Sequence, residues 1–329
     1  MADVDWIPVP PLISLITINY NQAVVTCDLL ESTRQLTYPN YEIIVVDNGS
    51  AEDPSERIRQ GNYSHVRVIV SPDNLGFSGG NNLGIQQAKG EYYFLLNNDT
   101  IVTPDLLEQL IKPFVQDATI GVCCPKIRYH DQPNIIQYAG YHPLNKYTGR
   151  TWAIGLMEPD QGQHDQAKPT YFAHGAAMLV SREVLDRVGS LDDSFFLYYE
   201  ELDWSMRIRK AGYQIYYQPE ALIYHRESMS VGKQNPMKVY YHTRNRLWFM
   251  RRNVEKLPLL VFYVYYFGLA LPKAFVHYAL QRQPAYLKAV RDAIAWNVKH
   301  TVRKTDIEKT PSPVTEPFEA RLTNATPTN

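Results

Sequence analysis

Cysteine is scarce in this chain of 329 residues, which contains only Cys27, Cys123 and Cys124. None of the three belongs to a Cys-X-X-Cys pair, so the spacing argues against a disulfide framework and against a cysteine-based zinc site. So few cysteines fit a reducing compartment. The first residues also lack the basic stretch and apolar run of a secretory signal, and we therefore expect a cytoplasmic protein.

Two common nucleotide-binding signatures are also missing. The chain has neither the Gly-Lys-Ser/Thr sequence of a P-loop nor a Gly-X-Gly-X-X-Gly fingerprint, which argues against a kinase and against a dehydrogenase. With 45% hydrophobic and 20% charged residues, the composition is globular and excludes collagen-like, coiled-coil and wholly disordered chains.

The overall charge is small but unevenly distributed. The formal net charge of the chain is −1, whereas residues 1–235 carry −10 and residues 236–304 carry +11. We therefore expect the acidic and basic parts to meet different partners. The last residues, from about 305 to 329, are rich in Pro, Thr, Asn and Glu, which predicts a disordered tail.

Strand and helix patterns alternate through the first hundred residues. Apolar runs typical of buried strands are separated by helix-compatible stretches; the strands are expected at 12–18, 41–47, 65–70 and 91–96, and the helices near 23–35, 53–60 and 78–89. This alternation predicts an α/β fold with βαβ units and a mostly parallel sheet. Residues 123–168 show little periodicity, and we expect a loop-rich insertion there.

Polar side chains or glycines follow each of the four apolar runs. Thr17 and Asn19 end the first run, Asp47 ends the second, residues 74–82 follow the third, and residues 97–99 follow the fourth. Ligands bind at the carboxyl ends of the strands in such sheets, so these loops together indicate a nucleotide cradle. Ordinary turn chemistry, which uses the same residue types, is the alternative for any one loop.

Two of these loops suggest specific contacts. The Asp47 carboxylate could accept a hydrogen bond from the ring N–H of uracil or thymine. The alternative is that Asp47 caps the helix expected near Asp53, although Asp53 itself is better placed for that. The glycines of residues 76–80 permit close approach of a diphosphate or ribose to the backbone.

A divalent metal is the ligand that we expect at Asp99. This carboxylate follows a strongly apolar strand, and Mg²⁺ and Mn²⁺ take oxygen ligands from side chains and substrate phosphates. Helix capping is the alternative role. The sequence Thr103-Pro104-Asp105, however, offers an N-cap and an N1 proline of its own, which leaves Asp99 free.

Six motifs taken in order resemble the inverting glycosyltransferases of family 2, which have the GT-A fold, and most closely a rhamnosyltransferase-like branch. The motifs are VVDNGS, NLGFSGGNNLGI, LLNNDT, HGAAMLVSREV, FFLYYEELDWSMRIRKAGY and YHRESMS. The resemblance covers roughly residues 13–252. It implies a nucleotide-diphospho-sugar donor, linked to dTDP or UDP, a bound Mn²⁺ or Mg²⁺, and direct displacement with inversion at the anomeric carbon.

The resemblance assigns roles to individual residues. Asn97-Asn98-Asp99 occupies the family's Asp-X-Asp position, which makes Asp99 a metal ligand, and His225 matches the second metal ligand. Asn81 stands where many members have Arg. The residues expected to bind the nucleotide sugar are Thr17, Asn19, Asp47, Gly79, Asn81, Asn98, Gly175 and Arg244. For Arg244, a solvated basic face is the alternative.

The catalytic base is expected in the stretch Tyr199–Asp203, which resembles the family's Glu-Asp-X-Asp sequence. Glu201 stands at the position of the base, and Glu200 is the second choice. A carboxylate within hydrogen-bond reach of the acceptor hydroxyl can take its proton. Asp203 lies four residues before Arg207, so a structural ion pair is the better prediction for it.

The acceptor is expected to contact Trp204 and His174, with Trp204 as a plain core residue the alternative. No Gln-X-X-Arg-Trp stretch occurs, which argues against a processive, polymer-forming member of the family. Residues 257–271 contain no charge and have bases on both sides, which predicts an interfacial segment on an anionic membrane leaflet. The alternatives are a buried core helix and, less favoured, a true membrane span. The apolar run also favours lipid over nucleic acid as the partner of the basic part.

These observations predict an enzyme of the following organisation. Residues 1–235 form the GT-A domain, with a nucleotide-sugar half at about 12–125 and an acceptor half at about 170–235, and residues 236–304 form a helical membrane-associating extension. We expect transfer of a sugar, L-rhamnose from dTDP-rhamnose as the best guess, to a glycan or polyprenyl-diphosphate-linked acceptor in cell-surface polysaccharide synthesis. The site is expected on the inner face of the cytoplasmic membrane. The alternative is a non-catalytic nucleotide-sugar-binding protein of the same fold.

Overall fold

The computed structural model of the chain describes residues 9–226 and 235–301. Its strands form one mixed sheet in the order β3-β2-β1-β4-β9-β6-β10-β5, with β7 paired to β6 and β8 to β10. The strands are β1 (Ile13–Asn19), β2 (Tyr41–Asn48), β3 (Val66–Ser71), β4 (Tyr92–Leu96), β5 (Thr100–Val102), β6 (Ile120–Tyr129), β7 (Ile136–Tyr138), β8 (Lys168–Thr170), β9 (Ala177–Ser181) and β10 (Gln214–His225).

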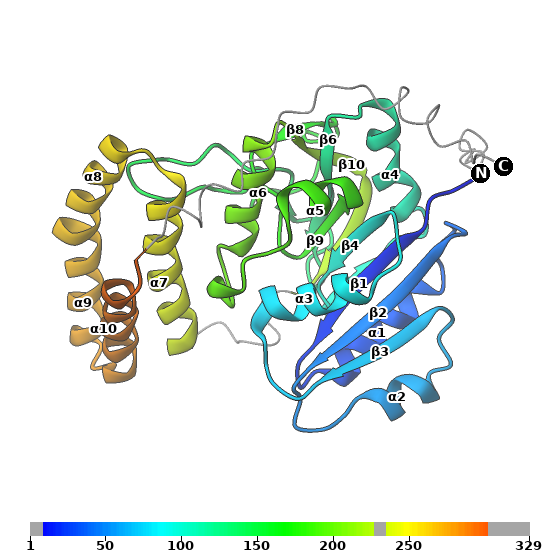
Figure 1. Cartoon of the computed structure of the whole chain (residues 1–329), viewed down its shortest axis with the longest axis horizontal. Helices are drawn as coiled ribbons and strands as arrows, with labels where there is room; N and C mark the ends of the chain where they lie inside the picture. Colours follow the sequence, from blue (N-terminus) through cyan, green and yellow to red (C-terminus); the bar gives the residue numbers. More distant parts are fainter. Residues whose placement is uncertain (1–8, 227–234, 302–329) are drawn as a thin grey trace.

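The first half of the sheet is parallel, as the alternation of patterns predicts. Strand β1 pairs in parallel with both β2 and β4, and β2 pairs in parallel with β3. Right-handed crossovers place α1 (Ala23–Thr33) and α2 (Ser55–Gln60) on one face and α3 (Gly76–Gln87) on the other (Figure 1). The chain turns back between β3 and β4, so the carboxyl ends of β2, β1 and β4 lie side by side.

The second half of the sheet shows that the loop prediction for residues 123–168 is wrong at its start. Strand β6 runs through Cys123 and Cys124, pairs antiparallel with β9 and parallel with β10, and is buried over most of its length. A strand covered on both faces has no alternation of polar and apolar residues to mark it. Helices α4 (Leu106–Gln116) and α5 (Arg182–Val188) flank this half, and the Ser181 side chain caps α5 by accepting from the Val184 N–H.

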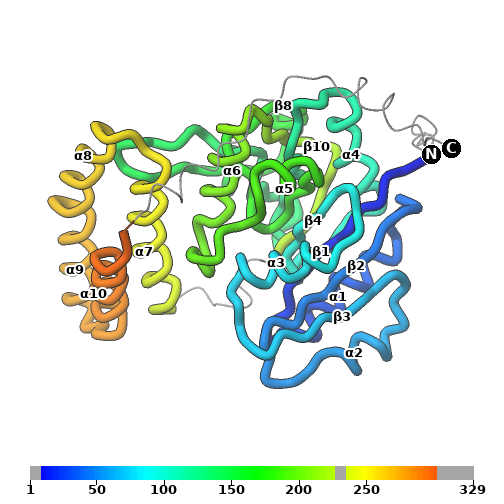
Figure 2. Tube along the Cα trace, in the orientation of Figure 1, coloured from blue at the N-terminus to red at the C-terminus, as the bar shows by residue number. Residues whose placement is uncertain are grey.

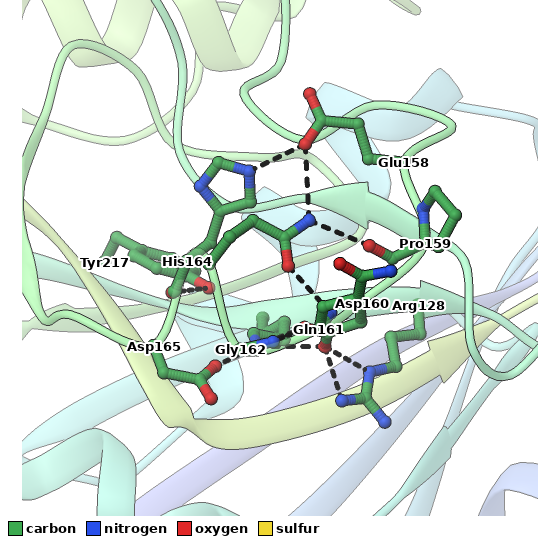
Figure 3. Close-up of polar contacts among 11 residues, drawn as sticks. Arg128, Glu158, Pro159, Asp160, Gln161, Gly162, His164, Asp165 and Tyr217 are labelled. Atoms are coloured by element: carbon green, nitrogen blue, oxygen red, sulfur yellow. Dashed lines mark hydrogen bonds and ion pairs between the residues drawn. The ribbon is translucent and has the colours of Figure 1, made fainter.

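The loop after β7 is ordered by ion pairs rather than by regular structure. Asp160, almost wholly buried, pairs with Lys126 at 3.0 Å and with Arg128, and the exposed Asp165 also contacts Lys126. Figure 3 shows Arg128 reaching the Asp160 carboxylate, and the backbone carbonyl of His164 accepting from Tyr217 Oη. Although burial raises it, the contacts with Lys126 and Arg128 lower the pKa of Asp160 to about 2.

Five α-helices follow α5 in the described part of the chain, with β10 between the first and the second of them. They are α6 (Glu200–Lys210), α7 (Pro236–Asn253), α8 (Lys256–Tyr265), α9 (Leu271–Leu280) and α10 (Pro284–Lys299), with a π-helical turn at Tyr266–Ala270 that joins α8 to α9. Figure 2 shows α7 between α6 and the other C-terminal helices.

A second hydrophobic core joins these helices to the sheet domain. Phe195 and Leu202 from the first part of the chain pack with Trp248, Phe249 and Phe262 from the C-terminal part. A buried ion-pair network adds to it: Asp203 pairs with Arg207 at 3.0 Å, as predicted, and with Arg252 at 3.2 Å. The expected boundary at residue 235 therefore separates two stretches of sequence that share one core.

Candidate active site

A buried hydrogen-bond chain connects the carboxyl ends of β2, β1 and β4. Asn19 Nδ2 donates to Asp47 Oδ1 at 2.7 Å, and Thr26 Oγ1 donates to Asn19 Oδ1 at 2.8 Å. Asn98 Nδ2 then donates to Thr26 Oγ1 at 3.0 Å. The structure thus brings Asn19, Asp47 and Asn98 together, and Ser50 Oγ donates to the same Asp47 oxygen at 2.6 Å. Thr26 on α1 was not predicted, because a lone helical threonine carries no signal.

Three other residues expected to bind the nucleotide are also buried. Thr17 has no exposed surface, and its hydroxyl has no hydrogen-bond partner among the described residues. Asn81 Nδ2 donates back to the carbonyl of Phe77 at 3.0 Å. A Cβ at Gly79 would lie 2.7 Å from Leu75 Cβ, so packing within α3 explains that glycine. Contacts of these three residues with a donor stay predictions.

Asp99 and His225 meet where β5 pairs with β10. Asp99 Oδ1 lies 3.0 Å from His225 Nε2, and both side chains are nearly buried. On the other side of the ring, Nδ1 lies 2.8 Å from Gln137 Oε1. When Nδ1–H donates to this oxygen, the neutral ring presents the Nε2 lone pair to Asp99, which is the arrangement of a metal-ligating histidine.

These residues fit a divalent cation. Asp99 Oδ1 has no partner other than His225 Nε2 within the described parts of the chain, and this nitrogen also lies 3.4 Å from Asn97 Nδ2. A carboxylate oxygen and an imidazole nitrogen therefore lie next to each other, as two ligands of one ion would. Two adjacent ligands of an octahedral ion with bonds of about 2.1 Å lie about 3 Å apart, which matches the observed separation. Within residues 9–226 and 235–301, no three His, Cys, Asp or Glu side chains form a metal-binding group.

Glu200 and Glu201 begin α6 and face low-dielectric surroundings. Burial raises the pKa of Glu201 to about 7, although backbone N–H groups at the helix start oppose the shift. Burial and the neighbouring Glu201 carboxylate raise the pKa of Glu200 well above its ordinary value. One oxygen of each has no hydrogen-bond partner among the described residues. A carboxyl group with a pKa near neutrality is suited to proton transfer, and Glu201 is the more accessible of the two.

The segment at His174 and Gly175 lies between the Glu201 carboxylate and the Asp99–His225 pair. A Cβ at Gly175 would lie 3.9 Å from Glu201 Cγ, in ordinary contact. The His174 ring lies edge-on to His225, with centroids 6.4 Å apart, and stacks on Tyr141. Burial, with a smaller effect of His225, lowers the pKa of His174 to about 3, so the ring is neutral. Glu201 and His225 therefore flank one short segment.

Trp204 does not line the site, which corrects the prediction of an acceptor contact. It is 1% exposed and its Nε1 donates to the carbonyl of Gly189 at 2.8 Å. It belongs to the main core, because this position of α6 faces the sheet domain.

Arg244 is buried rather than part of a solvated basic face. Its Nη2 donates to the carbonyl of Ser194 at 2.6 Å and to that of Phe195, and its guanidinium lies over Trp296. These contacts hold the loop before α6. Binding of the donor diphosphate by Arg244 stays a prediction.

The capping argument for Asp99 also needs correction. Helix α4 begins at Leu106 after Asp105, without a side-chain cap, and Thr103 Oγ1 donates instead to the carbonyl of Leu222 at 2.9 Å. The geometry with His225, not the spare N-cap, is what leaves Asp99 available. Gln137 was missed altogether, because it lies on β7 in the region expected to be loop.

Known proteins resemble this chain in sequence and in fold. The family model "Glycosyl transferase family 2" matches residues 14–189. The low-salt glycan biosynthesis hexosyltransferase Agl10 of Haloferax volcanii is 30% identical over 179 residues, 53% of this chain and 55% of that protein. The N-acetylglucosaminyl-diphospho-decaprenol L-rhamnosyltransferase of Mycobacterium tuberculosis is 24% identical over 233 residues, 63% of this chain and 74% of that protein.

Some relatives are much longer than the matched region. An uncharacterised protein of Sinorhizobium fredii is 32% identical over 255 residues, 74% of this chain and 27% of its own length. The chain thus spans about a quarter of that relative and about half of the Haloferax protein.

Solved structures share the fold at low sequence identity. A mannosyltransferase from Pyrobaculum calidifontis in complex with GDP-Man and Mn²⁺ superposes with a TM-score of 0.55 at 18% identity, over 90% of this chain and 77% of the other. TarS 1-349 of S. aureus in complex with UDP-GlcNAc gives 0.54 at 17% identity, over 86% of this chain and 80% of the other.

Proposed function

The chain belongs to glycosyl transferase family 2 and has the GT-A fold, and from this premise we propose that it is a metal-dependent, inverting, non-processive glycosyltransferase. It transfers a sugar from a nucleotide-diphospho-sugar linked to dTDP or UDP to a hydroxyl of a glycan or lipid-linked glycan acceptor. L-Rhamnose from dTDP-rhamnose is the best candidate, because a distant relative is named as an L-rhamnosyltransferase that acts on a diphospho-decaprenol substrate.

The observation that carries this proposal is the position of Glu201. Its carboxylate, with a pKa raised to about 7, adjoins Gly175, and the neighbouring His174 contacts His225 of the metal-ligand pair. Displacement at an anomeric carbon requires a base on the acceptor side and a group that holds the leaving diphosphate on the other. Glu201 and the metal ligands Asp99 and His225 lie on two sides of this segment in that way.

The residues then have separate tasks. Glu201 takes the proton of the acceptor hydroxyl. At the same time the hydroxyl oxygen forms the bond to the anomeric carbon, and the bond from this carbon to the diphosphate oxygen breaks on the opposite side. Asp47 accepts from the ring N–H of the base, and Asn19 keeps that carboxylate in place. Asp99 and His225 would hold Mn²⁺ or Mg²⁺, which when bound neutralises charge on the leaving diphosphate.

Binding can be tested by thermal shift with dTDP, UDP and GDP, each with and without Mn²⁺. We expect dTDP or UDP to raise the melting temperature only with Mn²⁺, since a ligand of the folded state stabilises it by mass action. Asp99→Ala should abolish the shift. Asp105→Ala, at the start of α4, is the matched control and should keep it. No shift with either pyrimidine diphosphate would contradict the nucleotide site.

A turnover assay distinguishes an enzyme from a non-catalytic nucleotide-sugar-binding protein. The second possibility is suggested by Asn97, which stands in place of the first acidic residue of Asp-X-Asp. Glu201→Gln should bind donor and Mn²⁺ as the wild type does, while transfer falls by about 10²–10⁴-fold. If the wild type binds donor but transfers to no glycan or lipid-linked acceptor, the alternative function is the correct one.

The membrane surface is the second part of the proposal. Residues Lys256–Leu280 form a helical segment of 25 residues that by length and composition could cross a membrane. Only 11% of its most apolar stretch is buried inside the protein. Its exposed apolar side chains are Leu257, Leu260, Val261, Val264, Phe267, Leu269, Phe275, Val276 and Leu280. These nine residues are called the apolar strip below.

Packing and charge favour an interfacial position for this segment over a span. Phe262 and Tyr266, on its inner side, are buried against the protein, so the helix lies along the body of the molecule. The exposed bases next to the apolar strip are Lys256, Lys273, Arg282, Lys288 and Arg291. Arg252, which the sequence places among them, is instead buried in ion pairs. We propose that the apolar strip enters the anionic inner leaflet of the cytoplasmic membrane, where a polyprenyl-diphosphate-linked acceptor would be found.

A further inference from the structure

The loop that leads into α6 has an unusual backbone. Phe196, Tyr198 and Tyr199 have φ of 63°, 69° and 76°, in the left-handed region that bulky residues rarely adopt. Tyr199 is the N-cap of α6 and makes no side-chain capping bond. Such a backbone is strained and persists only where its surroundings enforce it. The path of this loop sets the direction in which Glu200 and Glu201 leave the backbone.

One side chain of α7 contacts three carbonyls of this loop. Asn245 has no exposed surface, and its Nδ2 group is shared among the carbonyls of Phe195 at 2.9 Å, Leu197 at 2.8 Å and Tyr198 at 2.7 Å. From the opposite side, the Phe77 N–H at the start of α3 donates to the carbonyl of Phe196 at 2.6 Å.

Ring stacking on α7 fixes the side chains of the same loop. Phe196 stacks on Tyr241 with ring centroids 5.1 Å apart, and Tyr198 stacks on His242 at 4.3 Å. Neighbouring positions of α7 therefore hold both the carbonyls and the rings of residues 195–199. The loop therefore lies between α7 and the start of α3, and contacts both helices.

We propose that Asn245 is a positioning residue for the base, acting through the strained loop 195–199 to aim Glu201 at the acceptor hydroxyl. This inference rests on the proposed function, because it takes Glu201 as the base. Without the Asn245 amide, the carbonyls of Leu197 and Tyr198 lose this donor, while that of Phe195 keeps Arg244 Nη2, and the left-handed residues can relax. A shift of about 1 Å in a catalytic group costs about 10²-fold in rate.

The surroundings of Glu201 make its titration a readout of position. The ionisable groups that act on it are Glu200 beside it, Tyr199 at the N-cap and Tyr141 from the loop after β7, against which the neutral His174 stacks. Burial is the largest cause of the raised pKa of Glu201. A loosened loop admits water, so the pKa of Glu201 should fall towards its ordinary value.

The test compares two asparagines of the same helix. Asn245→Ala should lower the single-turnover rate by about 10²-fold, change the donor KM by less than about threefold, and move the acid limb of the pH–rate profile to lower pH. The control is Asn253→Ala, because Asn253 Nδ2 donates to Asp203 on α6 at 2.8 Å and does not touch the loop. Asn253→Ala should keep the rate within about threefold and leave the acid limb where it is.

Two results would overturn the inference. One is an Asn245→Ala protein with a lower melting temperature but the rate and pH profile of Asn253→Ala, which would mark a structural role alone. Another is an equal loss in both variants. If Asn245→Ala does not fold, Asn245→Ser, which keeps one donor, is measured by the same criteria, with a smaller rate loss and the same direction of the acid limb expected.

Glu201→Gln, measured alongside, distinguishes this failure from failure of the proposed function. If Glu201→Gln loses transfer while Asn245→Ala behaves as Asn253→Ala does, the positioning role fails and the proposed function stands. If Glu201→Gln transfers at the wild-type rate, Glu201 is not the base: the positioning role and the assignment of Glu201 are then wrong, while sugar transfer itself stands and Glu200 becomes the candidate base.

Discussion

Adjacent carboxyl groups at the start of α6 give the site a pH dependence that acts on rate. Glu201 must be ionised to take a proton, and its pKa is raised to about 7 by burial. Transfer should therefore increase with pH up to about 7 and then level off. Because Glu200 and Glu201 interact, the acid limb belongs to the pair rather than to one residue.

The same groups act on stability with the opposite sign. A carboxyl group whose pKa is higher in the folded than in the unfolded state contributes stability below the unfolded value, about 4.3, and this contribution is lost as pH increases through the folded value. Replacing the buried Glu200 carboxyl group by a neutral amide should therefore stabilise the folded state most at high pH.

Glu200→Gln makes this measurable. Its melting temperature relative to the wild type should increase between pH 5 and pH 8, by about 2–4 °C for each kcal/mol of stability regained. Glu52→Gln, at an exposed position, is the control and should show a constant difference. A Glu200→Gln curve parallel to that of Glu52→Gln would contradict the raised pKa of Glu200.

Helix α3 shows at the scale of an element how packing accounts for a glycine-rich motif. From the sequence, the glycines of residues 76–80 are predicted to let a diphosphate or ribose approach the backbone. In the structure, a Cβ at Gly84 would lie 2.4 Å from Ile16 Cγ2, and one at Gly80 would lie 2.9 Å from Ile18 Cδ1. These two glycines let the helix lie directly on β1. At Gly76, with φ of 71°, the nearest obstacle is the carbonyl of Phe196.

Gly84→Ala should therefore destabilise the protein. Overpacking of this kind lowers the free energy of unfolding by about 1–3 kcal/mol, which denaturant titration can measure. Gly268→Ala, in the π-helical turn, meets no atom within 4 Å and should be neutral or stabilising by up to about 1 kcal/mol. Equal stability of the two variants would argue against close packing of α3 on β1.

The strand ends of the first half were predictable at the scale of elements, and the site across them was only partly so. Asn19 and Asp47 could be placed because parallel strands that are neighbours end at the same edge. Gln137 could not, because nothing local marks a three-residue strand within a long irregular stretch. The grip of Asn245 on residues 195–199 is also invisible in the sequence, since the partners are about 50 positions apart.

The whole molecule combines a sheet domain and a helical extension that share a core, which bears on membrane binding. The apolar strip is held on the outside because Phe262 and Tyr266 face inward. A surface of this kind, with exposed bases beside it, should bind anionic vesicles and release them as salt screens the charges.

Leu260→Glu/Val264→Glu tests this surface, because both side chains are exposed on α8. Binding to phosphatidylglycerol vesicles in a sedimentation assay should fall at least about fivefold. Val115→Glu, an exposed apolar position on α4, should bind as the wild type does. Equal binding of wild type and double variant, or resistance of membrane-bound protein to alkaline extraction, would contradict an interfacial strip.

The sequence by itself determined the α/β class, the strand ends that carry Asn19, Asp47 and Asp99, and the pairing of Asp203 with Arg207. These features depend on local periodicity and short spacings, which the chain carries in its residue order. The tertiary structure alone decided that Asp99 faces His225, that Trp204 is core, that Arg252 is buried and that α7 holds the loop before Glu201. Each of these depends on which distant segments share a core, and burial, which raises the pKa of Glu201, exists only once they do.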